Sequence, residues 1–327
     1  MRRLLTVCLA AGAAFAQAVP SNFENTKIET RAAGGNLEAA MKAATSQTGP
    51  VWIGYSVPIV AGERHVCGWD GDHRLASRHM SLEGPSALYV LYRAEQGTIG
   101  KVRMSTPDCE IDAGGVPMIW LTGVDSAQSV RFLQGFVAEK SDSAVSAIAL
   151  HNDPSADQAL DALTATDRPV EIRRKAVFWL GVARGRHGYE RLSSIVQKDP
   201  SDKVREHAIF ALSQSKEPEA IPAIVKIARE DSNAHVRGQA LFWLAQKAGS
   251  KIAADAIGRA IADDPETEVK KKAVFALSRL PNGEGVPKLI DVAKSNRNTE
   301  VRKQALFWLG QSKDSRALEF IEQILAR

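Results

Sequence analysis

The second half of the chain repeats one segment five times at nearly constant spacing. The segment IRRKAVFWLG begins at Ile172, and related segments begin at Val204, Val236, Val269 and Val301. The alanines that these segments share are spaced by 32, 32, 33 and 32 residues, at Ala176, Ala208, Ala240, Ala273 and Ala305. A period of this length indicates a solenoid, because each unit buries its apolar face only by stacking on its neighbours.

Each unit carries two helical patterns. One is the repeated segment, and the other is a second apolar segment such as AIPAIVKIA, which ends at Ala228. Prolines such as Pro222 lie near the starts of these second segments, where a missing backbone N–H costs least. Two antiparallel helices per unit predict an array of helical hairpins.

The repeated segments resemble the HEAT family, in particular its phycobilisome-lyase-like repeats, whose pattern is D-x-x-x-x-V-R-x-x-A-x-x-A-L-G. An acidic or amide residue lies five positions before each start, at Asp167, Asp199, Asp231, Asp264 and Asn296. A basic residue follows each start, at Arg173, Arg205, Arg237, Lys270 and Arg302. The resemblance implies that these two positions form a ladder between neighbouring repeats, and that residues 167–327 form a right-handed α-solenoid.

The residues before the repeats have a different pattern. An expected helix over residues 37–45 is followed by apolar runs that are bounded by Gly, Pro and Asp, which is typical of strands. These runs begin at Val51, Ala87, Ile99 and Val116. We expect a small β-rich, α+β domain over residues 19–124. Residues 125–166 are expected to form a helical transition with a degenerate first repeat, so the whole chain is predicted to be a two-part α+β protein.

The first 18 residues have the features of a secretory signal peptide. Arg2 and Arg3 precede an apolar run from Leu4 to Phe15, and small residues that suit cleavage follow at Ala16 and Ala18. The run is too short to span a membrane, which takes about 20 apolar residues. We therefore expect an exported bacterial protein, periplasmic or secreted, with no integral membrane segment after cleavage.

Two cysteines follow the predicted signal peptide, Cys67 and Cys109, at a separation of 42 positions. An oxidising compartment favours their pairing. The loop-closure argument assigns such a bridge a stabilisation of roughly 3–4 kcal/mol. Two free thiols and a metal site are the alternatives.

The charge of the chain is unevenly distributed. Its net charge of +4 is too small for a protein that binds nucleic acid along its whole length. Residues 165–327 contain 29 Lys and Arg against 21 Asp and Glu, whereas residues 19–164 contain 11 against 17. Opposite charges suggest either docking between the two parts or an acidic partner for the solenoid, and a solvated surface is the ordinary alternative.

Phenylalanine occupies the same position in every unit. These residues are Phe178, Phe210, Phe242, Phe275 and Phe307. At 100° per residue the position lies near 240° from the starting residue, away from the centre of the helix's buried face. The HEAT resemblance would place the rings on the concave side as a binding surface. The alternative is that each ring leans into the neighbouring repeat. Basic residues flank the rings and join the candidate surface: Arg174, Lys175, Lys271, Lys272 and Lys303.

The next position alternates between a large and a small residue. Its occupants are Trp179, Ala211, Trp243, Ala276 and Trp308. This alternation favours core packing, in which bulky and small side chains interdigitate.

The sequence contains no motif for a nucleophile elbow, a phosphate loop or a dinucleotide fold. One cluster offers weak candidates for metal ligands: His65, Asp70, Asp72, His73 and His79. An exposed polar loop is the alternative. Deoxyhypusine hydroxylase is similar in its HEAT hairpins and uses His-Glu pairs to hold two irons, but none of the seven histidines here precedes a glutamate.

We expect an exported HEAT-repeat scaffold without enzymatic activity or cofactor, which binds a protein partner and no nucleic acid. The inner helices would present Phe and basic side chains to that partner. One alternative is an envelope enzyme, or a small-ligand or metal-binding protein, with its site in the N-terminal domain. Another is a HEAT enzyme that resembles a bilin lyase or a hydroxylase, which the lack of His-Glu motifs disfavours.

Overall fold

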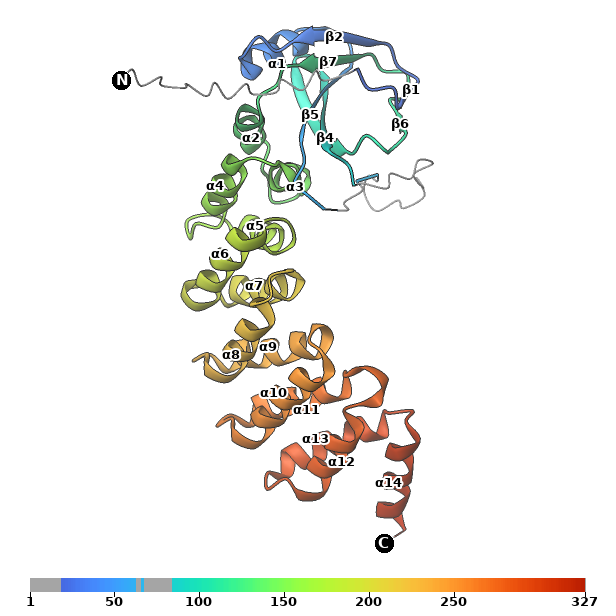
Figure 1. The fold of residues 1–327 in the computed structure, drawn as a ribbon, viewed down its shortest axis with the longest axis vertical. Coiled ribbons are helices and arrows are strands. Elements are labelled where there is room, and N and C mark those ends of the chain that lie inside the picture. Colours follow the sequence, from blue (N-terminus) through green and yellow to red (C-terminus); the bar gives the residue numbers. More distant parts are fainter. Residues whose placement is uncertain (1–18, 63–65, 68–83, 327) are drawn as a thin grey trace, which may run out of the picture. The chain divides into compact units, whose positions relative to one another are not determined.

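The protein divides into two compact units in its structure, a computed structural model that describes residues 19–62, 66–67 and 84–326 (Figure 1). The units are Met1–Ala156 and Asp157–Arg327. The expected signal peptide, residues 1–18, lies outside the described residues. So do the five weak metal candidates: His65, Asp70, Asp72, His73 and His79.

The first unit is built on a five-stranded mixed sheet with strand order β2-β7-β3-β4-β5. These strands are β2 Ile28–Ala32, β3 Val51–Pro58, β4 Ala87–Glu95, β5 Thr98–Ser105 and β7 Met118–Thr122. β7 pairs in parallel with both β2 and β3, whereas β4 is antiparallel to β3 and β5. The short strands β1 (Phe23–Glu24) and β6 (Ile111–Asp112) form a separate parallel pair.

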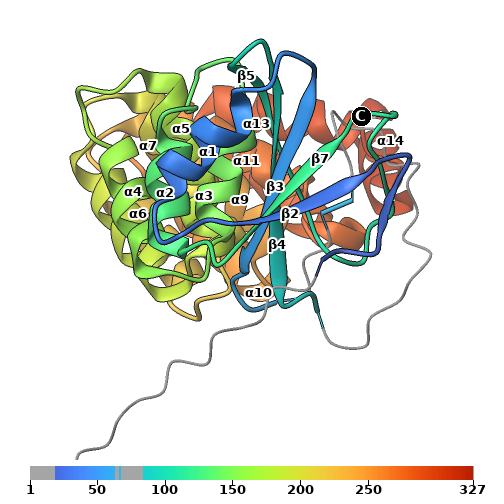
Figure 2. The ribbon, with the colours of Figure 1, turned by 90° about the horizontal axis from the view of Figure 1, so that it is seen from above.

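Three helices cover one face of this sheet: α1 Leu37–Thr45, α2 Ser126–Gln134 and α3 Ser143–Leu150 (Figure 2). Alternate residues of β3, among them Ile53 and Tyr55, are buried beneath these helices. Tyr92 of β4 contacts Phe132 of α2 edge to face, with ring centroids 5.5 Å apart. α2 and α3, expected in the transition segment, therefore complete the core of the first unit.

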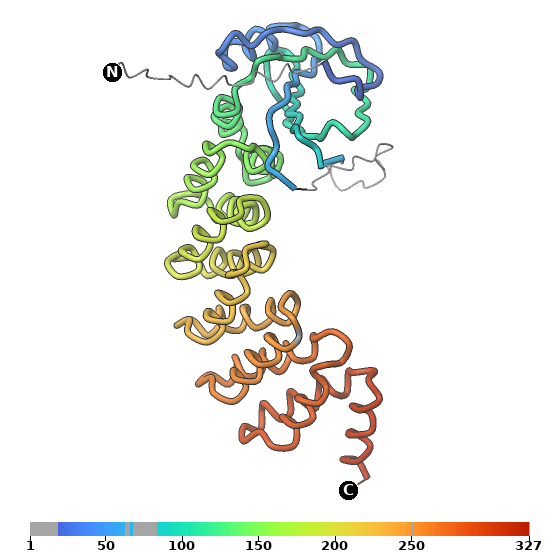
Figure 3. Tube along the Cα trace, viewed as in Figure 1, coloured from blue at the N-terminus to red at the C-terminus, as the bar shows by residue number. Residues whose placement is uncertain are grey.

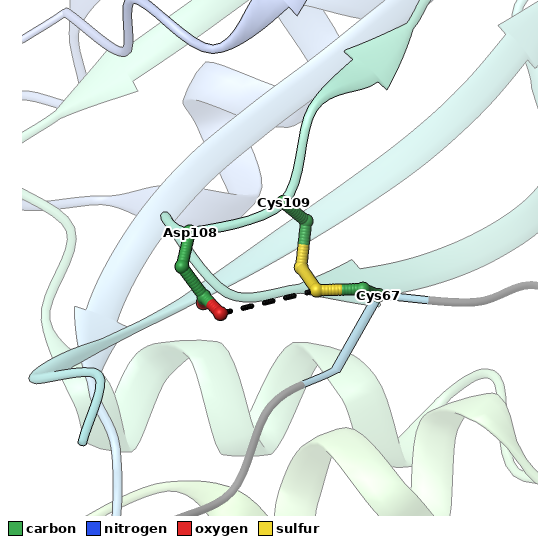
Figure 4. Close-up of side chains that lie close together, drawn as sticks. All are labelled: Cys67, Asp108 and Cys109. Atoms are coloured by element: carbon green, nitrogen blue, oxygen red, sulfur yellow. Dashed lines mark hydrogen bonds between the residues drawn. A yellow bond between two sulfur atoms is a disulfide. The ribbon is translucent and has the colours of Figure 1, made fainter. Parts of the chain in front are cut away.

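The opposite face of the sheet is covered by the β1–β6 pair and by a disulfide. Tyr89 and Trp120 form an apolar cluster there with Cys109, and Cys67 packs against it. The Cys67–Cys109 pairing expected from the sequence is present, with an S–S distance of 2.05 Å. An oxygen of Asp108 lies 4.0 Å from the Cys67 sulfur (Figure 4). Because the two sulfurs bond each other, this group of three does not offer thiolates to a metal.

A buried chain of hydrogen bonds ties β3 and β4 to α2 and the end of α3. His151 Nδ1 lies 2.6 Å from the Ala147 carbonyl, which only accepts, so this nitrogen carries the proton. The other ring nitrogen accepts from the Ser129 hydroxyl at 2.8 Å. Ser129 in turn accepts from Tyr55 at 2.7 Å, and Tyr55 accepts from Tyr92 at 2.9 Å. Burial raises the pKa of Tyr55 to about 12, so both phenols remain protonated donors.

The second unit is an array of helical hairpins, as expected for an α-solenoid (Figure 3). The repeated segments form α5 Val170–Ala183, α7 Asp202–Gln214, α9 Ala234–Lys247, α11 Thr267–Ser278 and α13 Thr299–Gly310. The intervening helices are α6 Gly185–Lys198, α8 Ala220–Glu230, α10 Ser250–Asp263, α12 Val286–Ser295 and α14 Ser315–Leu325. α4 (Pro154–Leu163) precedes the array, and a short 3-10 turn, Pro281–Gly283, precedes α12. The repeated helices pack in one row, each against the next.

Small residues allow the helices of this row to approach closely. The alanine shared by all five segments, exemplified by Ala208 and Ala240, is fully buried. A Cβ atom at Gly181 would lie 2.3 Å from the Ala211 carbonyl oxygen of the next repeat. Any larger side chain at this position of α5 would push the two helices apart.

Three buried ion pairs link successive repeats. Arg173 binds Asp199, and Arg205 binds both carboxylate oxygens of Asp231 at 2.7 Å. Arg237 binds the oxygens of Asp264 at 2.8 and 2.9 Å. Each of these aspartates also accepts a backbone N–H two residues later in the chain, so it anchors the start of its own repeat. The ladder implied by the HEAT resemblance thus has three rungs among the described residues.

The remaining ladder positions have other partners. Lys270 donates to the Ala262 carbonyl at 3.0 Å, and Arg302 donates to the Asn296 carbonyl at 2.7 Å. Asn296 uses its side-chain oxygen to accept the Asn298 N–H. Asp167 pairs with no basic side chain in the part of the chain that the structure describes. An asparagine offers no charge to a lysine, which explains why the rung between Lys270 and Asn296 does not form.

The buried hydrogen-bond chain makes Ser129 more important than its small size suggests. Ser129→Ala should lower the free energy of unfolding by about 2–4 kcal/mol, because it leaves Tyr55 and His151 without their shared partner. Tyr92→Phe removes only the terminal donor and should cost about 1 kcal/mol. Urea unfolding followed by near-UV circular dichroism measures both. Ser126→Ala on the same helix is the control, and equal midpoints for all three variants would contradict the network.

The stabilisation from the buried Arg237–Asp264 ion pair should decrease in acid. Burial is the largest single influence on Asp264 and opposes its ionisation. The hydrogen bonds from Arg237 and the Glu266 N–H, together with the charges of Arg237 and Lys270, outweigh burial and lower the pKa of the carboxyl group. The stabilisation is therefore complete above the unfolded pKa of about 3.9 and is lost as the pH falls through the lower folded pKa. Asp264→Asn should lose about 2–4 kcal/mol at pH 7, and its deficit relative to the wild type should shrink at pH 3. Asp263→Asn, at an exposed neighbour, is the control, and a pH-independent deficit in urea midpoints would contradict the rung.

Candidate binding surface on the repeat helices

The five repeated phenylalanines lie at the surface of the repeat row. Phe178, Phe210, Phe242 and Phe275 are half-buried, and Phe307 is 54% exposed. None of them is a fully buried core residue. Each ring therefore both contacts its neighbours and reaches solvent. The sequence had left packing against the next repeat and surface exposure as alternatives, and both apply in part.

The phenylalanines and the repeated tryptophans form one continuous line of rings, which we call the aromatic ribbon. Successive ring centroids along it are 4.6–6.0 Å apart. Its members in spatial order are Trp179, Phe178, Phe210, Trp243, Phe242, Phe275, Trp308 and Phe307. The ribbon crosses all five repeated helices, from α5 to α13.

The alternation of tryptophan and alanine gives the ribbon a period of two repeats. Ala211 and Ala276 are fully buried, whereas the three tryptophans are half-buried and pack on the rings beside them. Phe210 lies between Phe178 and Trp243, and Phe275 lies in the corresponding place two repeats later. The alanines thus fulfil the expectation of core packing, while the indoles contribute to the surface.

A groove of about 450 Å³ opens on the ribbon between α5, α7 and α9. Phe210 and Trp243 supply its aromatic lining, and Arg174, Lys203 and Gln239 supply polar groups. His207 lines it too, with its ring 5.5 Å from Phe210. Burial, with a smaller effect from the Arg174 charge, lowers the pKa of His207 to about 4. The imidazole is therefore neutral at pH 7 and adds a polar but uncharged wall.

The predicted basic residues are largely paired with acidic neighbours. Arg174 lies 3.1 Å from Glu171, and Lys303 lies 3.1 Å from Glu300. Lys271 lies 3.0 Å from Glu268, while Lys175 is half-buried. These i,i+3 pairs are exposed and contribute little stability, so a partner's carboxylate could replace the glutamate. Most of the basic side chains beside the ribbon are therefore paired with glutamates and do not form a continuous positively charged surface.

Lys272 belongs to a series of polar contacts that connects three repeats. Its ammonium donates to His235 Nδ1 at 2.8 Å, and His235 Nε2 lies 2.7 Å from Glu206. Burial lowers the pKa of Lys272. A Cβ atom at Gly238 would lie 2.3 Å from Cδ of Lys272, so the glycine leaves room for the lysine stem to cross α9. Gly238 occupies the position that carries Arg174, Lys271 and Lys303 in other repeats, and its lack of a side chain makes room for Lys272.

Two glutamines beside the ribbon were missed by the sequence reasoning. Gln239 and Gln304 occupy the same position of α9 and α13, three residues before the phenylalanine. Both are half-buried, and neither side-chain amide has a hydrogen-bond partner among the described residues. The signal that could have found them is their recurrence in the last two tryptophan-bearing repeats, where the other repeats have Lys175, His207 and Lys272.

In the first unit, a depression of about 570 Å³ lies between α1 and α2. Phe132 and Phe136 line it together with Gln128 and Arg131. The amide of Gln128 is already used, since it accepts from the Leu37 N–H and donates to the Gly35 carbonyl. This depression therefore offers an apolar wall and one guanidinium rather than an arrangement of converging reactive groups.

The chain is similar to several solved structures, at low sequence identity and low TM-score. YibA of Escherichia coli is 20% identical, with a TM-score of 0.35 over 61% of this chain and 75% of that one. The CpcE–CpcF complex of phycocyanin lyase from Nostoc is 21% identical, with a TM-score of 0.36 over 49% of this chain and 100% of that one. Human deoxyhypusine hydroxylase is 18% identical, with a TM-score of 0.31 over 61% of this chain and 74% of that one. These likenesses concern the fold alone.

The search among curated proteins found no match. No helix among the described residues combines the length and apolar character that a membrane crossing requires. The family of HEAT repeats matches residues 156–245, 189–278 and 254–327. Because these matches together extend over more than half of the chain, the protein belongs to the HEAT-repeat family.

Proposed function

We propose that this protein is an exported scaffold that binds a partner protein along the aromatic ribbon. The observation that carries the proposal is the continuous line of eight half-buried or exposed rings, which ends in Phe307 at 54% exposure. Large aromatic side chains dominate the energetics of protein interfaces. Here they are held on a rigid helical row, so binding orders few additional side chains.

The polar surroundings of the ribbon support the same role. The ion pairs of Arg174, Lys271 and Lys303 are exposed and can exchange their glutamates for carboxylates of a partner. Gln239 and Gln304 offer amide groups that are not engaged by any other residue that the structure describes. An apolar centre with a polar rim is the usual composition of a specific interface.

Export is supported by the cysteines and by the first residues of the sequence. The Cys67–Cys109 disulfide is of the kind that persists in oxidising compartments. The basic start and short apolar run of residues 1–18 are typical of a cleaved secretory signal. The scaffold would therefore act in the periplasm or outside the cell.

Partner capture should depend on the ribbon. A photo-crosslinking amino acid at position 304 is expected to trap a partner in the native cell, whereas the same group at position 252 of α10 should not. Phe307→Ser should then reduce capture at position 304 by at least tenfold, because it removes an exposed aromatic anchor. Ile252→Ser is the matched control, since Ile252 is 51% exposed but lies off the ribbon. Equal capture at both positions would contradict the proposed surface.

Export has its own test. Cell fractionation followed by intact-mass measurement should find the protein outside the cytoplasm, without about 18 N-terminal residues. Alkylation without reduction should modify neither Cys67 nor Cys109. A cytoplasmic chain that retains Met1 and has two alkylated cysteines would refute export while leaving the partner-capture test unaffected.

A further inference from the structure

We propose that the partner presents an extended peptide with two apolar anchor side chains four residues apart, flanked by acidic residues. Each anchor would occupy one of two equivalent notches in the ribbon. The first notch is formed by Phe210, Gln239 and Trp243, and the second by Phe275, Gln304 and Trp308. This inference rests on the proposed function, because it specifies what the ribbon binds.

The two notches have the same geometry. In the first, the Phe210 and Trp243 rings are 4.6 Å apart at an angle of 41°. In the second, the Phe275 and Trp308 rings are 4.8 Å apart at 40°. On the other side each phenylalanine is stacked on the preceding one at 6.0 Å, with angles of 18° and 7°. A side chain that fits one notch should therefore fit the other.

Each notch also carries an unused amide at the same place. Gln239 lines the groove of the first notch, and Gln304 holds the corresponding position on α13. Neither amide has a hydrogen-bond partner among the residues that the structure describes. A glutamine side chain both donates and accepts, which matches the N–H and C=O groups of an extended peptide. Because both residues are only half-buried, their amides are open to the backbone of a bound peptide.

The repeat spacing sets the distance between the anchors. The ring centroids that lead from Phe210 through Trp243 and Phe242 to Phe275 are 4.6, 5.0 and 6.0 Å apart, so the two notches are separated by no more than about 16 Å. An extended chain rises roughly 3.3 Å per residue, so a spacing of four residues, about 13 Å, fits within that distance. Side chains at i and i+4 also point to the same side of an extended chain, because its side-chain period is two.

The charges favour acidic residues beside the anchors. Lys203 is exposed at the groove and forms no ion pair among the described residues. His207, which also lines the groove, is neutral at pH 7. The second notch has Lys271 and Lys272 where the first has Glu206 and His207. Glu206 also lines the groove but is paired with His235, which leaves Lys203 for a partner's carboxylate at the first notch. At the second notch, a partner's carboxylate could replace Glu268 on Lys271.

Synthetic peptides can test this spacing with the full-length mature protein. The probes are fluorescein-labelled peptides of Ser, Thr and Asp that carry two phenylalanines four, six or eight residues apart, or only one. Fluorescence anisotropy should show at least tenfold tighter binding for the four-residue spacing than for the single anchor, because the second contact is intramolecular. Trp308→Ala should reduce the four-residue peptide to single-anchor affinity. Trp179→Ala, which removes a ribbon tryptophan outside both notches, should preserve the gain.

The other outcomes separate this inference from the proposed function. If all peptides bind with the same affinity, the ribbon binds apolar side chains but not at two spaced notches, and the inference fails alone. If no peptide binds while a crosslinker at position 304 still traps a partner, the partner presents a folded surface and the inference again fails. If light scattering shows a dimer that Trp308→Ala dissociates, the ribbon is a contact between two copies and the peptide proposal is wrong.

Discussion

The close approach of successive repeated helices is the contact on which the second unit depends. It requires a fully buried alanine in each helix and is tightest where Gly181 meets the backbone at Ala211. A single hairpin has no other surface on which to bury this face, so every repeat is stable only beside its neighbours. The same approach brings rings from adjacent helices within 6.0 Å of one another and thereby creates the aromatic ribbon.

Electrostatic interactions divide into two classes by burial. The Arg237–Asp264 rung has side chains that are only 8% and 5% exposed, and it fixes the orientation of one repeat on the next. The pairs that Lys271 and Lys303 form with glutamates are solvent-accessible and join residues of the same helix, so they do not fix one repeat on the next. Removing a partner from a buried pair leaves an uncompensated charge, whereas breaking an exposed pair costs little. The buried Arg–Asp pairs therefore connect the repeats, whereas the exposed Lys–Glu pairs lie beside the ribbon.

The sequence predicted those parts of the fold that follow from periodicity. The hairpin array, the helix over residues 37–45, the four apolar strands and the Cys67–Cys109 bridge all agree with the structure. β1 and β2 were missed because they lie in a polar segment, and their parallel partners follow about 90 residues later. The pairing of the basic residues with glutamates, and the two unengaged glutamines, depend on side-chain positions that a linear pattern does not contain. The helical angle of the phenylalanines left exposure and packing against the next repeat as alternatives, and the structure combines them, with four half-buried rings and one exposed ring.

The two-repeat period of the ribbon has a consequence for how such an array can change length. Trp179, Trp243 and Trp308 are separated by 64 and 65 residues, so the unit that preserves the ring pattern is a pair of hairpins. Duplication of one hairpin would place two alanine-bearing or two tryptophan-bearing helices side by side and interrupt the line of rings. Duplication of a pair would extend the line and add one more notch. A single added repeat could keep the buried alanine contacts, but the line of rings continues unbroken only when repeats are added in pairs.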